Sequence, residues 1–327
     1  VYAGADIYQF STDGTLLLRS PLTLPPAVRA SGEWLRHWAA HRPDQTFLAE
    51  RRGGGDWDRL SYAAALDQTR RIAQGLIDRG LDDRTPVMVL SGNGIEHALI
   101  ALGAMHAGVP VVPVSTAYSL ASRDHAKLRA IAECVQPAVV YADDPQAYGQ
   151  ALQALGLPNT GFADLLAPQA TVAVDEAFAR LTPDTVVKIL FTSGSTGQPK
   201  GVINTQRMLT VNQQQSLAVW RFTAYEPPVV VDWLPWNHTF GGNYNFNLVL
   251  SNGGTMYIDT GRPMPGAFDT TLRNLRDIAP TMYFNVPRGF DLLVPELERD
   301  DAFCRHFFSR CTFVFYAGAA LPQAVWD

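Results

Sequence analysis

The residues from Phe191 to Val202 have the composition of a phosphate-binding loop. They read FTSGSTGQPKGV and directly follow the apolar run 186–191. Glycines let the backbone approach a ligand, amides and hydroxyl groups can surround phosphate oxygens, and a lysine supplies a positive charge. The residues expected to contact phosphate are Thr192, Ser193, Gly194, Ser195, Thr196, Gly197 and Lys200. A polar surface turn is the alternative, but turns seldom combine four hydroxyls, three glycines and a lysine.

This loop differs from the P-loop of ATPases and kinases. The P-loop has a glycine immediately before its lysine and a serine or threonine after it, whose hydroxyl binds Mg²⁺. Here Pro199 precedes Lys200 and Gly201 follows it. A nicotinamide site is also not expected, because the glycine-rich segment 91–94 has His97 where the third glycine of that fingerprint belongs.

A second segment, residues 233–247, has the composition of a substrate-pocket wall. It reads WLPWNHTFGGNYNFN, with five aromatic side chains, four asparagines, one histidine and no formal charge. Such a wall suits a flat, mostly apolar ligand, and we expect the glycine pair to leave room for it. The alternative is core packing, with His238 a satisfied buried histidine. Asn243 and Asn245 could bind a ring hydroxyl, and they could equally cap the following helix.

Alternating strands and helices are expected to position these two segments. The expected strands are residues 86–90, 109–114, 138–141, 186–191, 229–233, 255–258, 281–284 and 312–316. The expected helices are residues 31–41, 60–79, 95–106, 122–135, 204–220, 268–278 and 288–297. Residues 1–30 read as an irregular arm, and residues 143–184 as one short helix and a loop. The alternation predicts an α/β fold of mostly parallel, helix-covered sheets, with the phosphate loop at the carboxyl ends of strands.

The composition is that of a globular enzyme. The 327 residues are 47% hydrophobic and 17% charged, with a net charge of −5, which predicts about two domains. Scattered Lys and Arg residues predict no binding to nucleic acid or to a membrane surface. The uncharged stretches 97–122 and 233–258 contain glycine and proline, unlike a membrane-spanning helix. Cys134, Cys304 and Cys311 lack metal-binding spacing, so we expect no metal ligands in this chain and a reducing, cytoplasmic setting.

The phosphate loop resembles the signature of the adenylate-forming superfamily, [YF]-T-S-G-[ST]-T-G-x-P-K-G. This superfamily includes acyl-CoA synthetases, luciferases and peptide-synthetase adenylation domains. All eleven residues from Phe191 to Gly201 fit the signature. The sequence PWNHTF is similar to the superfamily's P-x-x-H-x-[aromatic] segment. Residues 316–322, YAGAALP, are similar to its G-G-A-P-L segment, with Ala320 in place of the proline.

The resemblance implies roles for individual residues. His238 would lie beside the substrate carboxylate and the passage for the CoA pantetheine, and Phe240 would flank the acyl group. Lys200 and His238 are the implied catalytic residues. The implied adenine-side residues are Gly318, Ala319 and Ala320, and the implied substrate-binding residues are His238, Phe240, Gly241, Gly242 and Asn243. The implied cofactors are ATP, Mg²⁺ and CoA.

Longer segments, such as residues 89–120 and 284–293, resemble bacterial feruloyl-CoA synthetases, and the likeness runs from Asp13 to Asp327. This branch implies ATP-dependent activation of a ferulate-like acid as an acyl adenylate, followed by thioester formation with CoA, in aromatic acid catabolism. The ferulate specificity comes from the resemblance alone. Another aryl or medium-chain acid, a carrier-protein acceptor, and a non-catalytic nucleotide- or acyl-binding module remain open alternatives.

The resemblance also implies the domain organisation. Residues 1–327 would form an incomplete N-terminal adenylation domain, with one subdomain at about 60–205 and another at about 1–59 plus 206–327. The chain ends before the expected Y-G-x-T-E segment, whose glutamate would bind Mg²⁺, and before the C-terminal domain with its adenylation lysine. We therefore expect this chain alone to be weakly active or inactive. The oligomeric state is open, and a homo-oligomer is permitted.

Overall fold

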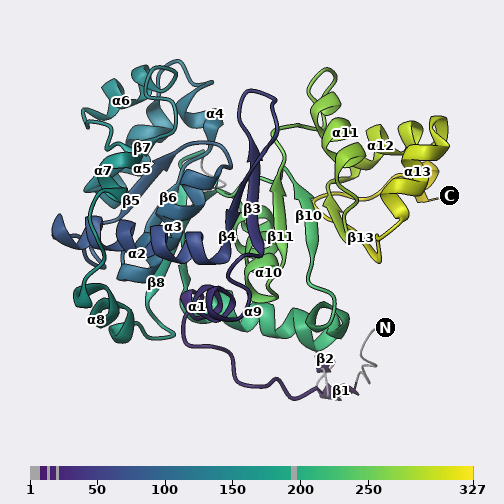
Figure 1. Cartoon of the computed structure of the whole chain (residues 1–327), viewed down its shortest axis with the longest axis horizontal. Coiled ribbons are helices and arrows are strands. Elements are labelled where there is room, and N and C mark those ends of the chain that lie inside the picture. Colours follow the sequence, from purple (N-terminus) through teal and green to yellow (C-terminus); the bar gives the residue numbers. More distant parts are fainter. Residues whose placement is uncertain (1–7, 13–14, 20–21, 193–196, 327) are drawn as a thin grey trace.

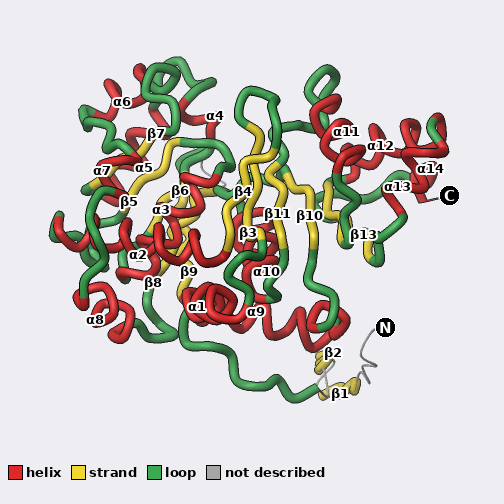
Figure 2. The backbone as a smooth tube through the Cα atoms, in the orientation of Figure 1, coloured by secondary structure: helices red, strands yellow, loops and turns green. Residues whose placement is uncertain are grey.

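A five-stranded sheet carries the candidate phosphate loop. The computed structural model describes residues 8–12, 15–19, 22–192 and 197–326. The strands of this sheet are β5 (Val87–Leu90), β6 (Val111–Pro113), β7 (Val139–Ala142), β8 (Val186–Thr192) and β9 (Lys200–Thr205). Their order is β7-β5-β6-β8-β9, and only the β8–β9 pair is antiparallel. Figure 2 shows these strands in yellow behind their covering helices.

A four-stranded sheet carries the candidate substrate-pocket segment. Its order is β10-β11-β3-β4, in which β3 and β4 form the antiparallel pair. The strands outside the five-stranded sheet are β1 (Tyr8–Thr12), β2 (Thr15–Arg19), β3 (Thr46–Arg51), β4 (Trp57–Ser61), β10 (Val229–Asp232), β11 (Thr255–Ile258), β12 (Met282–Asn285) and β13 (Phe313–Tyr316). β12 and β13 form a parallel pair beside β10, where Thr281 N donates to Val229 O at 2.9 Å.

Helices cover both faces of the five-stranded sheet. Val87 and Val89 of β5 pack into the core cluster that includes α2 (Tyr62–Asp78) and α3 (Ile95–Ala107), whereas Met88 and Leu90 pack into the cluster that includes α5 (Ala126–Val135). Successive side chains of a strand point to opposite faces, so a strand buried on both faces is apolar throughout. Figure 1 shows the C-terminal helices α11 (Phe268–Asp277), α12 (Pro287–Arg299) and α13 (Asp301–Phe308) gathered beside β10, at the opposite end from α6 (Gly149–Leu155) and α7 (Phe162–Leu166).

The helices of the described residues begin and end as follows. They are α1 (Gly32–His41), α2 (Tyr62–Asp78), α3 (Ile95–Ala107), α4 (Thr116–Ser119), α5 (Ala126–Val135), α6 (Gly149–Leu155), α7 (Phe162–Leu166), α8 (Val172–Arg180), α9 (Gln206–Val219), α10 (Phe246–Ser251), α11 (Phe268–Asp277), α12 (Pro287–Arg299), α13 (Asp301–Phe308) and α14 (Gln323–Trp326). Two further segments are helical but not α-helical. They are the 3₁₀ turn η1 (Arg221–Ala224), which is wound more tightly than an α-helix, and the π-helical turn η2 (Thr239–Asn245), which is wound more widely. None of the helices in the described residues combines the length and hydrophobicity needed to span a lipid bilayer.

The expected fold class, an α/β fold with two mostly parallel, helix-covered sheets, is confirmed. Four expectations about elements are wrong. The arm at 1–30 contains the β1–β2 hairpin, the helix expected from residue 60 begins at Tyr62 after β4, residues 143–184 form three short helices, and strand β9 separates the phosphate loop from helix α9. The proposed division near residues 59 and 205 stays a prediction.

Candidate functional site

The candidate phosphate loop is the turn of a β-hairpin. Thr192 of β8 pairs with Lys200 of β9, and Phe191 pairs with Gly201. Gly197 has a φ of 79°, in the region that favours glycine. Thr192, Gly197 and Lys200 are all exposed. The hairpin therefore presents these residues at the carboxyl end of β8, where ligands bind in parallel α/β sheets. Ser193, Gly194, Ser195 and Thr196 lie outside the described residues.

His238 is the N-cap residue of the π-helical turn η2, which follows β10 after a short connection. Its imidazole is exposed, so the alternative of a satisfied buried histidine is wrong. The Nδ1 atom accepts a hydrogen bond from Phe240 N at 3.4 Å. Because Nδ1 accepts, the neutral ring carries its proton on Nε2, which can donate to a ligand. π-helical turns occur often at functional sites, where they redirect side chains.

The glycine pair of this turn is required by close backbone packing. A Cβ atom on Gly241 would lie 2.2 Å from Leu234 O, and one on Gly242 would lie 2.1 Å from Trp236 O. Both glycines are buried. Gly241 lines a pocket beside His238, whereas Gly242 faces the packed interior next to Lys188. The pair thus lets η2 fold back onto the segment that precedes it.

An uncharged pocket of about 430 Å³, here called the aromatic pocket, lies between α9, η2 and the end of β13. Its lining residues are Asn204, Met208, Leu209, Asn212, Thr239, Phe240, Asn243, Tyr244, Phe315 and Ala317. Phe240 lies 6.0 Å from Phe315 and 6.5 Å from Tyr244, measured between ring centroids. This pocket brings together Phe240 and Asn243, two of the predicted substrate-binding residues.

Side-chain amides supply the polarity of the aromatic pocket. Asn243 Nδ2 donates to Asn204 Oδ1 at 2.9 Å, while Asn243 Oδ1 has no hydrogen-bond partner among the described residues. Asn245 Nδ2 donates instead to Asp232 Oδ2 at 3.1 Å. Neither amide caps α10, so that alternative is wrong.

A second pocket of about 340 Å³, here called the histidine pocket, contains His238 and Gly241. Phe240 lines both this pocket and the aromatic pocket, so the two pockets meet at this residue. Gly318, in the loop after β13, has a φ of 95° and also lines the histidine pocket. Ala319 and Ala320 follow it and are exposed, but neither lines these two pockets.

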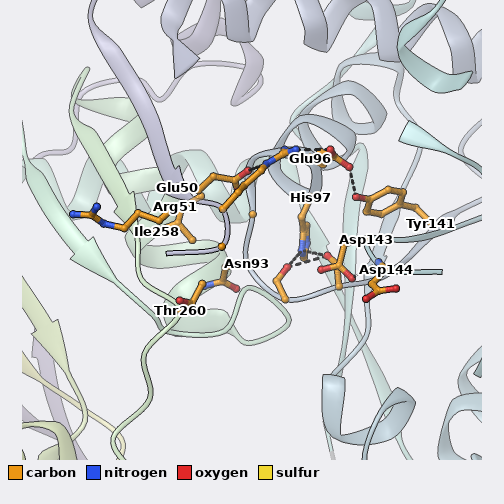
Figure 3. Close-up of a pocket in the computed structure, with 15 residues that line it drawn as sticks. Glu50, Arg51, Asn93, Glu96, His97, Tyr141, Asp143, Asp144, Ile258 and Thr260 are labelled. Atoms are coloured by element: carbon orange, nitrogen blue, oxygen red, sulfur yellow. Dashed lines mark hydrogen bonds and ion pairs between the residues drawn. The ribbon is translucent and has the colours of Figure 1, made fainter. Parts of the chain in front are cut away.

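A third pocket of about 530 Å³, here called the acidic pocket, adjoins the histidine pocket through Ser91, Gly92, Asn93 and His97. Figure 3 shows Glu96 and Tyr141 joined on one side, with Arg51 pointing away from them. Tyr141 OH donates to Glu96 Oε2 at 2.6 Å. Sequence reasoning missed this pocket, which includes the glycine-rich segment 91–94 for which no nicotinamide site is expected.

Charges in the acidic pocket are partly neutralised. Arg52 lies 2.9 Å from Glu50 and 3.2 Å from Glu96. The hydrogen bond that Arg52 donates to the Glu50 carboxylate raises the pKa of Arg52. Burial lowers the pKa of His97 to about 4, so this ring is neutral at pH 7. His97 Nδ1 lies 3.0 Å from Ser91 Oγ.

Asp232 is a buried carboxyl group directly before the substrate-pocket segment. It is 2% exposed, and it accepts hydrogen bonds from Leu234 N and from Asn245 Nδ2, each at 3.1 Å. Burial raises its pKa to about 7. Sequence reasoning missed this residue, although an aspartate at the end of an apolar strand was a visible signal.

The described residues can be tested against the cofactors that the resemblance implies. Among them no group of three His, Cys, Asp or Glu side chains could hold a metal ion, so these residues alone do not form an Mg²⁺ site. The exposed hairpin with its lysine fits a polyphosphate, and the aromatic and histidine pockets are large enough for an acyl group and a narrow thiol chain.

Comparisons with known proteins agree on one family. A family model described as AMP-binding enzyme matches residues 35–327. The long-chain-fatty-acid–CoA ligase ACSBG2 of Xenopus laevis is 23% identical over 279 residues, which cover 78% of this chain and 36% of the ligase. The chain thus spans about a third of that relative's length.

Two solved structures share the fold. VinN has a TM-score of 0.75 at 19% identity, with 93% of this chain and 72% of VinN covered. The fatty acyl-adenylate ligase from L. pneumophila, in complex with acyl adenylate and pyrophosphate, has a TM-score of 0.69 at 17% identity, with 93% of this chain and 52% of the ligase covered. At these identities the similarity shows the fold.

Proposed function

This chain belongs to the AMP-binding enzyme family, and from that premise we propose that the complete protein activates an aromatic carboxylic acid as its acyl adenylate. The proposed acid is ferulate-like, and the proposed acceptor of the acyl group is the thiol of CoA. We further propose that the protein works in the cytoplasm, where ATP and CoA are available.

One observation carries this proposal: Phe240 lines both the aromatic pocket and the histidine pocket, and His238 lies two residues before it. An acid whose ring occupied the aromatic pocket would bring its carboxylate toward His238. The exposed Nε2–H of that imidazole would then donate to a carboxylate oxygen. Lys200 and the β8–β9 hairpin would hold the polyphosphate of ATP.

The reaction has two steps. A carboxylate oxygen attacks the α-phosphorus of ATP and pyrophosphate leaves; the CoA thiolate then attacks the acyl carbon and AMP leaves. The protein's contribution to both steps is to position the reactants and to stabilise charge on phosphate. In this proposal Lys200 compensates charge on the departing pyrophosphate, and Gly318, Ala319 and Ala320 lie on the adenine side. Gly241 would line the acyl carboxylate side, with Gly242 packed behind it.

The lining of the aromatic pocket supports an uncharged acyl group. None of the described residues that line it is Asp, Glu, Lys, Arg or His. An amino acid substrate would bring an ammonium group, for which this pocket has no counter-ion. A flat acid with a neutral polar substituent fits better, because side-chain amides lie beside aromatic rings there.

ATP–pyrophosphate exchange by the complete native gene product tests the proposal. Ferulate, benzoate and hexanoate are offered separately, and thioester formation is then measured with CoA and with a carrier protein bearing pantetheine. Exchange stimulated chiefly by ferulate, followed by feruloyl-CoA formation, is the expected result. Stimulation by another acid would keep the chemistry and overturn the substrate. No exchange with any acid would favour a binding module.

A further inference from the structure

Lys188 is a buried lysine that has no acidic partner in the part of the chain that the structure describes. It lies on β8, shortly before the phosphate loop, and is 5% exposed. Among the described residues no ion pair includes it, and its Nζ lies 5.9 Å from the ring centroid of Phe246. Burial lowers the pKa of its ammonium group to about 8. An isolated buried charge is unfavourable, so an apolar residue would suit this position better unless the amine has a specific task.

The amine of Lys188 holds the turn that carries the candidate site. Its Nζ donates to Gly242 O at 2.7 Å. Gly242 N in turn donates to His238 O at 2.9 Å. Two hydrogen bonds therefore connect β8 with the backbone of His238 through one residue of η2, Gly242.

The turn has little freedom to take another position. The backbone of Gly242 packs directly against the backbone of Trp236, and a Cβ added to Gly242 would lie 2.1 Å from Trp236 O. The same turn carries Phe240 and Asn243, which line the aromatic pocket. A shift of Gly242 would therefore move His238 and the pocket wall together, relative to β8.

We propose that Lys188 is a positioning residue that fixes His238 and the η2 turn relative to β8, and hence to the candidate phosphate loop. Its effect on catalysis rests on the proposed function, in which the carboxylate beside His238 must reach a phosphorus atom held by the β8–β9 hairpin. Reacting atoms must be held close and aligned, and a misplacement of about 1 Å costs about a hundredfold in rate.

Lys188→Met in the complete protein tests this role, because methionine fills similar space without a donor. The matched control is Lys127→Met, which removes an exposed lysine lying over Tyr118, outside the site. We expect Lys188→Met to lower kcat/KM for the acid in pyrophosphate exchange by about 10- to 100-fold, and Lys127→Met to change it by less than about twofold. Hydrogen exchange of peptides covering residues 238–247 should quicken only in Lys188→Met.

Lys188→Gln keeps a donor on a shorter, neutral side chain, and it should recover part of both effects. If Lys188→Met does not fold, kcat/KM and hydrogen exchange of residues 238–247 in Lys188→Gln test the proposal instead. Wild-type kcat/KM and wild-type hydrogen exchange in Lys188→Met would overturn the proposal. Lost activity with unchanged hydrogen exchange at 238–247 would overturn it too, because the turn would then be held without the lysine. If the wild-type protein activates no acid, the proposed function fails, and the hydrogen-exchange comparison still tests the connection.

Discussion

Thr192 and Lys200 lie directly opposite each other in the antiparallel pair of β8 and β9. Both ends of the candidate phosphate loop are therefore held by one sheet. Lys200 enters the site from a strand, with its backbone fixed by pairing and its side chain exposed. A lysine held in this way can meet a phosphate with little rearrangement of the chain, which favours electrostatic stabilisation.

Replacing Lys200 with alanine should slow adenylation. The strand keeps its backbone pairing, so the loss is that of one positive charge near the leaving pyrophosphate. We expect kcat for pyrophosphate exchange to fall by about 10- to 1000-fold in the complete protein. Lys127→Ala, which removes an exposed lysine elsewhere, should leave exchange unchanged. Normal exchange in Lys200→Ala would contradict the assignment of the loop.

Replacing His238 should separate its capping role from its proposed chemical role. Asparagine can still accept the hydrogen bond from Phe240 N, but its amide donor sits on a shorter side chain than the Nε2–H of histidine, whereas alanine has neither an acceptor nor a donor. We expect His238→Asn and His238→Ala to lose exchange activity alike, by about 10- to 100-fold. Thermal unfolding should show that only the alanine variant loses stability, by about 1 kcal/mol. An active His238→Asn would refute the chemical role.

Replacing Asn243 with leucine should change the preference between acids. The substitution removes the amide beside the aromatic pocket, where Asn243 Oδ1 lacks a partner. We expect the ratio of kcat/KM for ferulate to that for cinnamate, which lacks ring oxygens, to fall by about tenfold. Met208→Leu alters an apolar lining residue of the same pocket and should affect both acids alike. An unchanged ratio in Asn243→Leu would exclude recognition of the ring hydroxyl by this residue.

Asp232 should make stability depend on pH. Burial raises the pKa of Asp232 to about 7, and the neighbouring Asp259 adds to the effect while Arg262 opposes it. Between about pH 4 and pH 7 the unfolded chain loses this proton while the folded chain keeps it, so the free energy of unfolding falls as pH rises. The fall attributable to Asp232 amounts to about 4 kcal/mol across that window.

Asp232→Asn should remove that contribution, because an amide does not titrate. Urea unfolding at pH 4.5 and at pH 8 measures it: the wild type should lose stability relative to Asp232→Asn as pH rises. Asp269→Asn, which removes an exposed carboxyl group, controls for the loss of one surface charge. Parallel pH curves for the wild type and Asp232→Asn would show that Asp232 is ionised throughout the window.

The sequence predicted most buried strands within one or two residues, because apolar runs such as 87–90 and 255–258 have few alternatives in an α/β chain. It failed at antiparallel hairpins. The segment Lys200–Thr205 reads KGVINT, a mostly exposed strand with glycine and asparagine, and its sequence predicts a loop and the start of a helix, although it pairs with β8. The β3–β4 hairpin was also missed, despite Gly53 and Gly54 at its turn, with φ of 61° and 78°.

The site was predictable in part. The segment around His238 was recognisable because its aromatic and asparagine side chains are contiguous in sequence. The acidic pocket was not, because Glu50, Glu96 and Tyr141 come from three separate elements and meet only in the folded chain. Lys188 and Asp232 were missed for a different reason: each is a single charged residue in or at the end of an apolar strand, and the hydrogen bond that links it to η2 forms only in the folded chain.

β9 is an edge strand of the five-stranded sheet, and this position affects the tendency of the protein to aggregate. In the described part of the chain β9 has a neighbour only on the β8 side, and its side chains Val202 and Ile203 are 48% and 55% exposed. A strand with unpaired backbone groups and apolar side chains is a template for pairing with another molecule. Pairing of β9 with the β9 strand of a second molecule would promote aggregation during expression and storage. The same edge strand carries Lys200, the lysine of the proposed site.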